Sequence, residues 1–92
     1  MSRHRHGELE LYYEVHGDDS LPPLMLLHGN TASSAMFSAL VPNLTAKRRI
    51  VLVDLLDHGR SGRYRELPRH LWEANALAIR GLLKELSLSR LD

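Results

Sequence analysis

The chain has 92 residues and a mass of 10.5 kDa, which suffices for one small domain with a single hydrophobic core. Its hydrophobic content of 43% excludes a strongly disordered chain, and its net charge of +1 argues against nucleic acid as a partner, because phosphate contacts require a larger basic excess. The chain has no cysteine, which excludes a disulfide bond and a thiolate nucleophile. It also has no apolar run long enough to cross a membrane. We therefore expect a cytoplasmic protein without a membrane partner.

The N-terminal segment predicts a β-hairpin. Residues 8–16 alternate between apolar and polar side chains, which is the pattern of a half-buried strand. Residues 3–6 form a short polar stretch, and Gly7 between the two segments suits a tight turn. We therefore expect these two segments to pair with each other.

Two short apolar runs predict two further strands. Residues 24–27 are apolar throughout, and so are residues 50–53. Short apolar runs bounded by turns are typical of strands that are buried on both faces, as in a parallel sheet. Because parallel strands need a crossover connection, the segment between the two runs should contain a helix.

A helix is predicted in that connection, over residues 33–44. Its apolar residues recur at helical spacing, and Ser33 or Ser34 is suited to cap its start. Pro42 must end or kink this helix, because proline lacks the amide hydrogen that a helix interior requires.

The clearest predicted helix spans residues 66–88. Apolar side chains recur there at steps of three and four residues, with Trp72 as an anchor in the core. The order of the predicted elements indicates an α/β fold with one domain over residues 1–92. We expect a sheet of about four strands, made of a parallel pair and the N-terminal hairpin, flanked by two helices.

A loop of small residues follows the first apolar strand, where open α/β sheets bind their ligands. It begins with His28 and Gly29, and the glycine allows a close backbone approach. The amides of Asn30 and Thr31 follow, in a position suited to face a developing oxyanion. The same residues also suit a plain connecting turn, so the spacing leaves two interpretations.

A second loop, over residues 54–62, follows the other apolar strand. It contains Asp57, His58 and Ser61, which are the residue types of a catalytic triad. Residues that are neighbours in one loop rarely reach the geometry in which an acid orients a base and the base contacts a nucleophile. The segment also lacks the G-x-S-x-G elbow, because Arg63 occupies the position of its last glycine. We therefore interpret this segment as a structured loop.

Together these segments resemble the N-terminal part of an α/β-hydrolase-fold protein of the haloperoxidase, esterase and dehalogenase-like kind. Four features match in order: a strand closed by glycine (8–17), an apolar strand ending in His-Gly (26–29), the turn D-L-L-D-H-G-R-S (54–61) and a helix (72–86). Asp57 departs from the family, which prefers glycine at that position. The resemblance covers nearly the whole chain and implies the strand order first, second, fourth, third.

The resemblance implies that the backbone N–H of Asn30, directly after His-Gly, belongs to an oxyanion hole, and the amide of Thr31 beside it is the second candidate. It implies no cofactor, and none of the six histidines has the spacing of a metal site. His28 is then structural rather than the catalytic histidine. The expected site-shaping residues are His28, Gly29, Asp54, Asp57, His58, Gly59 and Ser61.

No G-x-S-x-G motif occurs in the 92 residues, so no catalytic residue is assigned in this chain. By resemblance, the nucleophile, acid and base would follow in a later segment. We therefore expect a truncated N-terminal part of an enzyme that hydrolyses an ester or a related small substrate, inactive by itself. A small molecule is then the partner only when a C-terminal part completes the site.

Two other interpretations remain open. Without a neighbouring strand, residues 24–27 would form an open apolar sheet edge, and such edges recruit other strands. This favours a non-catalytic interaction module that pairs through the edge, with self-association as one form of pairing. The other interpretation is an orphan truncated reading frame without selected function.

Overall fold

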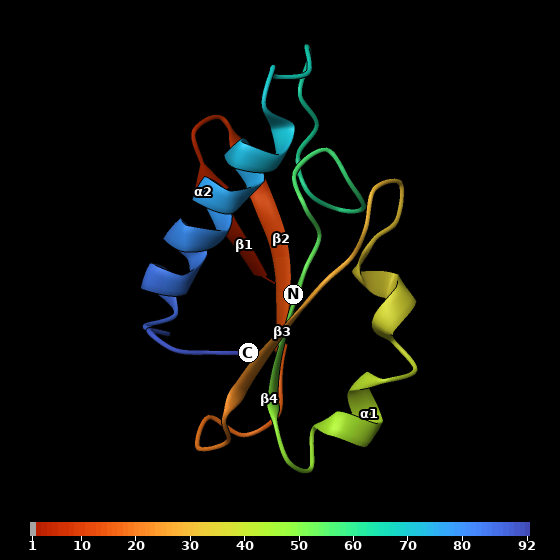
Figure 1. Cartoon of the computed structure of the whole chain (residues 1–92), viewed down its shortest axis with the longest axis vertical. Coiled ribbons are helices and arrows are strands. Elements are labelled where there is room, and N and C mark those ends of the chain that lie inside the picture. The colour runs from red at the N-terminus through yellow and green to blue at the C-terminus, as the bar shows by residue number, and fades with distance from the viewer. Residues whose placement is uncertain (1) are drawn as a thin grey trace.

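The computed structural model describes residues 2–92 and contains a four-stranded mixed sheet with helices on both sides (Figure 1). The strands are β1 (Ser2–His6), β2 (Leu9–His16), β3 (Pro23–Leu27) and β4 (Arg49–Val53). Between β3 and β4 lie a 3₁₀ helix and a short α-helix, η1 (Ser34–Phe37) and α1 (Val41–Leu44), and β4 is followed by α2 (Leu71–Glu85). This is the α/β fold class that the sequence predicts.

The strands lie in the order β1-β2-β4-β3, which confirms the order that the resemblance implies. β1 and β2 form the predicted antiparallel hairpin, with Gly7 in the turn at a φ of 60°. β2 is antiparallel to β4, whereas β3 is parallel to β4, with Leu24 opposite Ile50. Because β3 and β4 are adjacent and parallel, their carboxyl ends lie at the same end of the sheet. The loops that follow the two strands are therefore neighbours.

The core is divided by β4, whose side chains alternate between the two faces of the sheet. Val51 and Val53 pack on the face that α2 covers, and Ile50 and Leu52 pack on the face that η1 and α1 cover (Figure 1). These four residues are at most 5% exposed, which confirms the prediction of a strand buried on both faces. The core on the α2 side consists of Leu11, Tyr13, Val51, Val53, Leu56, Ala78 and Leu82.

The prediction of a single helix over residues 33–44 is wrong. The segment forms η1 and α1, two helices of 4 residues each. Ser33 caps η1, since its Oγ accepts a hydrogen bond from the Ala35 N–H at 3.3 Å. Pro42 lies in the first turn of α1, where its missing N–H is harmless, whereas a continuous helix would press its ring against the carbonyl of residue 38.

α2 is shorter than the predicted helix of residues 66–88, and it faces the sheet differently. Its buried side chains are those of Asn75, Ala78 and Leu82. Trp72, the expected core anchor, is 53% exposed, so that prediction is wrong. With about 3.6 residues per turn, the buried positions share a face roughly a quarter of a turn away from Trp72. No helix within residues 2–92 is long and apolar enough to cross a membrane.

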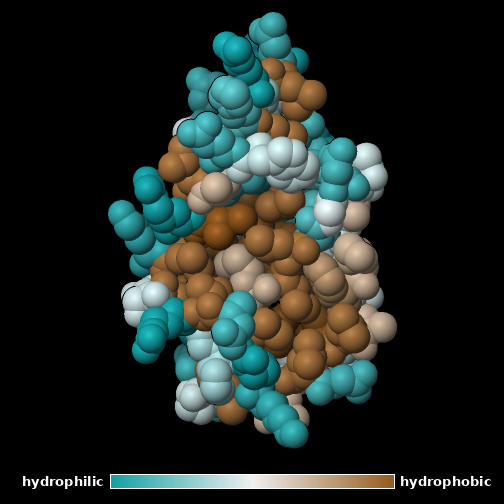
Figure 2. Space-filling model, in the orientation of Figure 1, coloured by the Kyte–Doolittle hydropathy of each residue, from teal (hydrophilic) through white to brown (hydrophobic). Residues whose placement is uncertain are grey.

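β3 forms one edge of the sheet, and apolar side chains gather over it between the two helical layers (Figure 2). Leu27 at its carboxyl end is 48% exposed. Nearer the start of β3, the backbone of Asp92 pairs with the strand. Met25 N–H donates to Asp92 O at 2.8 Å, and Asp92 N–H donates to Pro23 O at 3.3 Å. This is the hydrogen-bond pattern of a parallel bridge. The expected open edge is therefore open only beyond Met25.

Candidate functional site

Two loops at the carboxyl ends of β3 and β4 contain the residues expected to form or shape a site. The parallel pairing brings the starts of the loops together, since Leu27 lies opposite Val53. His28 and Asp54 are the first residues after the two strands, and they are only 5% and 3% exposed. Both side chains are polar and buried, so each must find hydrogen-bond partners inside the fold.

His28 ties the first loop to the second. Its Nε2 accepts a hydrogen bond from the Leu55 N–H at 3.0 Å, so this nitrogen carries no hydrogen. Its Nδ1–H donates to the carbonyl oxygen of Gly29 at 2.8 Å. Because both nitrogens are engaged, the ring cannot take up a proton without losing the bond to Leu55. This geometry makes His28 a link between loops rather than a general base.

Asp54 is a second link between the loops. Its Oδ1 accepts from the Ser34 N–H at 2.7 Å, and its Oδ2 accepts from the Arg60 N–H at 2.9 Å. Burial by itself raises the pKa of Asp54, but the hydrogen bonds from Arg60 and Ser34 outweigh it and hold the pKa below its usual value. Gly59 makes this arrangement possible, because a Cβ there would overlap the Asp54 carboxylate.

Asp57, His58 and Ser61 do not form a triad, because His58 bonds to neither of the other two. Ser61 is 5% exposed; its Oγ accepts from the Tyr12 N–H at 2.8 Å and donates to the Asp54 carbonyl oxygen. Asp57 has a φ of 70°, a left-handed conformation that aspartate tolerates better than most residues. One oxygen of its carboxylate accepts from the Tyr64 N–H at 3.0 Å. Asp57 and Ser61 therefore both stabilise the loop through bonds to the backbone.

Sequence reasoning misses two side chains that hold the second loop from outside it. Asn75 of α2 is 2% exposed, and its Oδ1 accepts from the Leu56 N–H at 2.6 Å. Tyr12 of β2 is also 2% exposed, and its hydroxyl accepts from Arg60 Nη1 at 2.7 Å. A lone amide among the apolar residues of α2 is a signal that identifies Asn75. Tyr12 gives no such signal, because it falls on the side of β2 that the alternation marks as polar.

Asn30 and Thr31 form the exposed tip of the first loop. The Ala32 N–H donates to Gly29 O at 3.3 Å, which closes a β-turn with Asn30 and Thr31 in its central positions. Thr31 has a φ of 63°, which is rare for a β-branched residue, and such strain is typical of functional loops. Neither amide of the pair donates a hydrogen bond to any of residues 2–92. The turn therefore presents two free N–H donors.

This tip borders a cleft of about 350 Å³ between the two loops and the start of α2. One carboxylate and one guanidinium face the cleft, along with an imidazole and two leucines. Within residues 2–92 there is no group of three or more His, Cys, Asp or Glu side chains suited to hold a metal ion. The cleft is lined by Asn30, Thr31, Ala32, Asp57, His58, Gly59, Arg63, Leu67 and Leu71.

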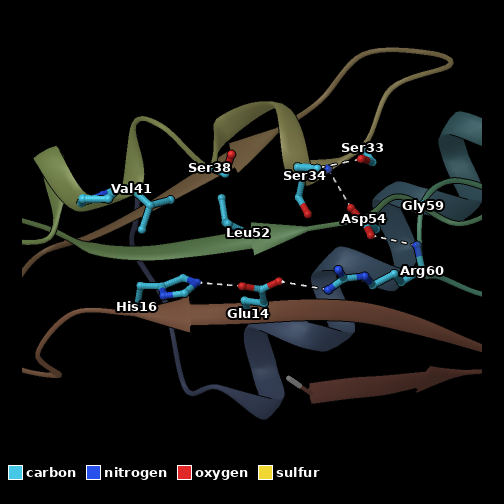
Figure 3. Close-up of a pocket in the computed structure, with 12 residues that line it drawn as sticks. Glu14, His16, Ser33, Ser34, Ser38, Val41, Leu52, Asp54, Gly59 and Arg60 are labelled. Atoms are coloured by element: carbon cyan, nitrogen blue, oxygen red, sulfur yellow. Dashed lines mark hydrogen bonds and ion pairs between the residues drawn. The ribbon is translucent and has the colours of Figure 1, made fainter.

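A larger cavity, of about 600 Å³, lies between η1, α1 and the face of β2, and shares only Gly59 with the cleft (Figure 3). Its charged wall is centred on Glu14, which accepts from Tyr12 Oη at 2.6 Å and from His16 Nε2 at 2.8 Å. These hydrogen bonds lower the pKa of Glu14. Arg60 Nη1 lies 3.7 Å from the same carboxylate. Because these groups pair with one another, the smaller cleft with its free amides is the better candidate site.

Known proteins match this architecture. The family model of the alpha/beta hydrolase fold matches residues 22–84. The chain is 37% identical to the magnesium-chelatase 30 kDa subunit of Rhodobacter capsulatus over 58 aligned residues. These residues make up 63% of this chain and 20% of that protein. An esterase from a marine microorganism superposes with a TM-score of 0.78 and 26% identity over 91% of this chain and 31% of its own. A hydrolase from Pseudomonas aeruginosa superposes with a TM-score of 0.88 and 23% identity over 98% of this chain and 34% of its own. This second likeness is one of fold.

The chain thus spans one fifth of the curated relative and about one third of each of these solved structures. The matched residues 22–84 contain both loops, the whole lining of the cleft and most of α2. They make up more than half of the chain. The protein therefore belongs to the α/β-hydrolase fold family.

Proposed function

We propose that this chain forms the oxyanion-binding part of a site that, in the complete protein, hydrolyses an ester or a related small substrate. The supporting observation is the pair of unpartnered amides of Asn30 and Thr31 in the exposed turn beside the cleft. When a nucleophile attacks an ester, negative charge develops on the carbonyl oxygen. Two preorganised N–H donors directed at that oxygen stabilise the charge where it forms.

The proposal assigns the nucleophile, acid and base to residues outside these 92, because no G-x-S-x-G motif occurs among them. We expect the isolated 92-residue chain to hydrolyse p-nitrophenyl acetate no faster than free imidazole does.

The test uses the complete protein and two substitutions at one position. Asn30→Pro removes the N–H and keeps the turn, because proline suits the second position of a β-turn. Asn30→Ala keeps the N–H and removes only the side chain. We expect kcat of Asn30→Pro to fall by on the order of 10²–10³ relative to Asn30→Ala, as is typical for one oxyanion donor. Equal kcat values for the two folded variants would contradict the proposal.

The apolar edge of the sheet favours a second candidate function, a non-catalytic module that pairs through β3. Leu27 is 48% exposed, and the surface over β3 is apolar (Figure 2). Light scattering after size-exclusion chromatography separates the two candidates. A dimer whose mass does not depend on concentration, and which Leu27→Lys converts to a monomer, supports the module. A monomer or a heterogeneous aggregate favours the hydrolase part.

A further inference from the structure

The imidazole of His58 lies buried beneath the cleft surface. The residue is 7% exposed, and its ring centroid is 5.2 Å from that of His28 and 6.1 Å from that of Trp72. Nδ1 lies 3.0 Å from the Leu56 carbonyl oxygen, which can only accept, so Nδ1 carries a hydrogen. The other nitrogen, Nε2, lies 3.2 Å from Oδ1 of the Asn30 side-chain amide. This second contact links the buried ring to the loop of the proposed oxyanion donors.

The side-chain amide of Asn30 has an accepting end and a donating end. When its oxygen faces Nε2, a hydrogen bond requires a proton on Nε2, and the ring is then positively charged because Nδ1 is protonated as well. A neutral ring instead has a lone pair at Nε2, which repels the amide oxygen and accepts from the amide NH₂. Each protonation state of His58 therefore matches one orientation of Asn30.

We propose that His58 is a positioning residue that sets which end of the Asn30 amide is turned toward the cleft. With a charged ring, Oδ1 accepts from Nε2–H, and the NH₂ group joins the free amides of Asn30 and Thr31. With a neutral ring, the NH₂ group donates to Nε2, and the oxygen is turned outward. The charged state thus offers an oxyanion or a carboxylate a third donor. The inference rests on the proposed function, which gives the Asn30 loop its ligand.

The groups packed around His58 do not dictate the orientation of Asn30 by themselves. His28 is engaged at both nitrogens, and Trp72 carries no charge. On the loop side, Asp57 and Arg63 line the same cleft with opposite charges, and Arg63 donates to two backbone carbonyls of its own loop. Imidazole is the side chain that changes charge between about pH 5 and 8. His58 is the one imidazole in the described lining of the cleft.

Nuclear magnetic resonance of the ¹⁵N-labelled 92-residue chain tests this inference without measuring activity. At alkaline pH we expect a scalar coupling across the hydrogen bond from Asn30 Nδ2 to His58 Nε2. The coupling should vanish as the ring gains its second proton, and the Asn30 NH₂ signals should move with the same midpoint as the His58 ring signals. Asn43, an exposed residue of α1, provides the matched control, and its NH₂ signals should not follow that titration.

The variant His58→Phe keeps an aromatic ring between His28 and Trp72 and removes both nitrogens. It should abolish the pH dependence of the Asn30 NH₂ signals. If it does not fold, the coupling and its titration in the unmodified chain decide the question. Absence of the coupling at alkaline pH, or Asn30 signals that move no more than those of Asn43, would overturn the inference. Neither result concerns the backbone amide, which Asn30→Pro tests separately in the complete protein.

Discussion

The Ser34 N–H donates a 2.7 Å hydrogen bond to Asp54 Oδ1, and this bond joins the segment after β3 to the segment after β4. The other carboxylate oxygen accepts from the Arg60 N–H at 2.9 Å. One side chain therefore holds η1 and the second loop together. Asp54 does not itself line the cleft that these segments enclose, so its contribution to the site is through the position of the backbone.

Asp54→Asn is expected to lower the free energy of unfolding by about 1–3 kcal/mol, because the asparagine NH₂ cannot accept and leaves the N–H of Ser34 or Arg60 without a partner. Urea denaturation followed by circular dichroism measures this change. Glu66→Gln is the matched control. Glu66 is exposed and has no hydrogen bond or ion pair within residues 2–92, so its replacement should change stability by less than about 0.5 kcal/mol. Equal effects of the two substitutions would refute the linking role of Asp54.

The same carboxylate predicts a sensitivity to acid. The fold holds the pKa of Asp54 below its unfolded value, so its contribution to stability is complete above the unfolded pKa of about 4 and is lost as the pH falls through the folded pKa. Below about pH 4, the free energy of unfolding should therefore fall more steeply for the unmodified chain than for Asp54→Asn. Urea denaturation at a series of pH values measures both curves. Parallel curves would show that Asp54 is not responsible.

Gly59→Ala is expected to destabilise the fold by about 1–3 kcal/mol, because the new Cβ would overlap the Asp54 carboxylate at a φ of 50°. Gly29→Ala is the control, since a Cβ there meets no atom within 4 Å and its φ is not positive. It should leave stability unchanged or raise it by up to about 1 kcal/mol. Thermal denaturation of both variants measures the difference, and a similar loss in both would argue against the steric account.

Ser61→Ala is expected to cost about 1–3 kcal/mol of stability, because it leaves the buried Tyr12 N–H without an acceptor. The control is Ser38→Ala, which replaces an exposed hydroxyl that bonds to none of residues 2–92. Chemical denaturation of the two variants compares them directly. If Ser61→Ala proved as stable as Ser38→Ala, the structural role of Ser61 would be wrong and a chemical role would need testing.

The strands were predictable because each depends on a local pattern. The apolar run of β4 and the alternation of β2 follow from which faces are buried, and the pairing of β1 with β2 follows from Gly7. The helices were less predictable. Residues 71–86 contain two adjacent apolar stripes, and only the packing against the sheet decides that Ala78 rather than Trp72 faces the core. The segment before β4 contains Pro42, which shows that a helix is interrupted but not where it restarts.

The two loops were predictable from their positions after apolar strands, whereas their internal bonds were not. The hydrogen bond from Ser34 to Asp54 joins residues 20 apart in the sequence, and that from Tyr12 to Ser61 joins residues 49 apart. Such pairs depend on the folded arrangement of the sheet and leave no periodic signal in the chain. The left-handed conformation of Thr31 was also unforeseeable, since β-branched residues rarely adopt it.

Asn75 gives α2 a mechanical connection to the cleft. Its bond of 2.6 Å to the Leu56 N–H attaches the helix to the backbone two residues before His58, whose ring contacts Asn30. The helix that packs on the sheet and the loop that lines the cleft therefore share one buried hydrogen bond, and the place of α2 on the sheet fixes the backbone from which the His58 ring reaches Asn30.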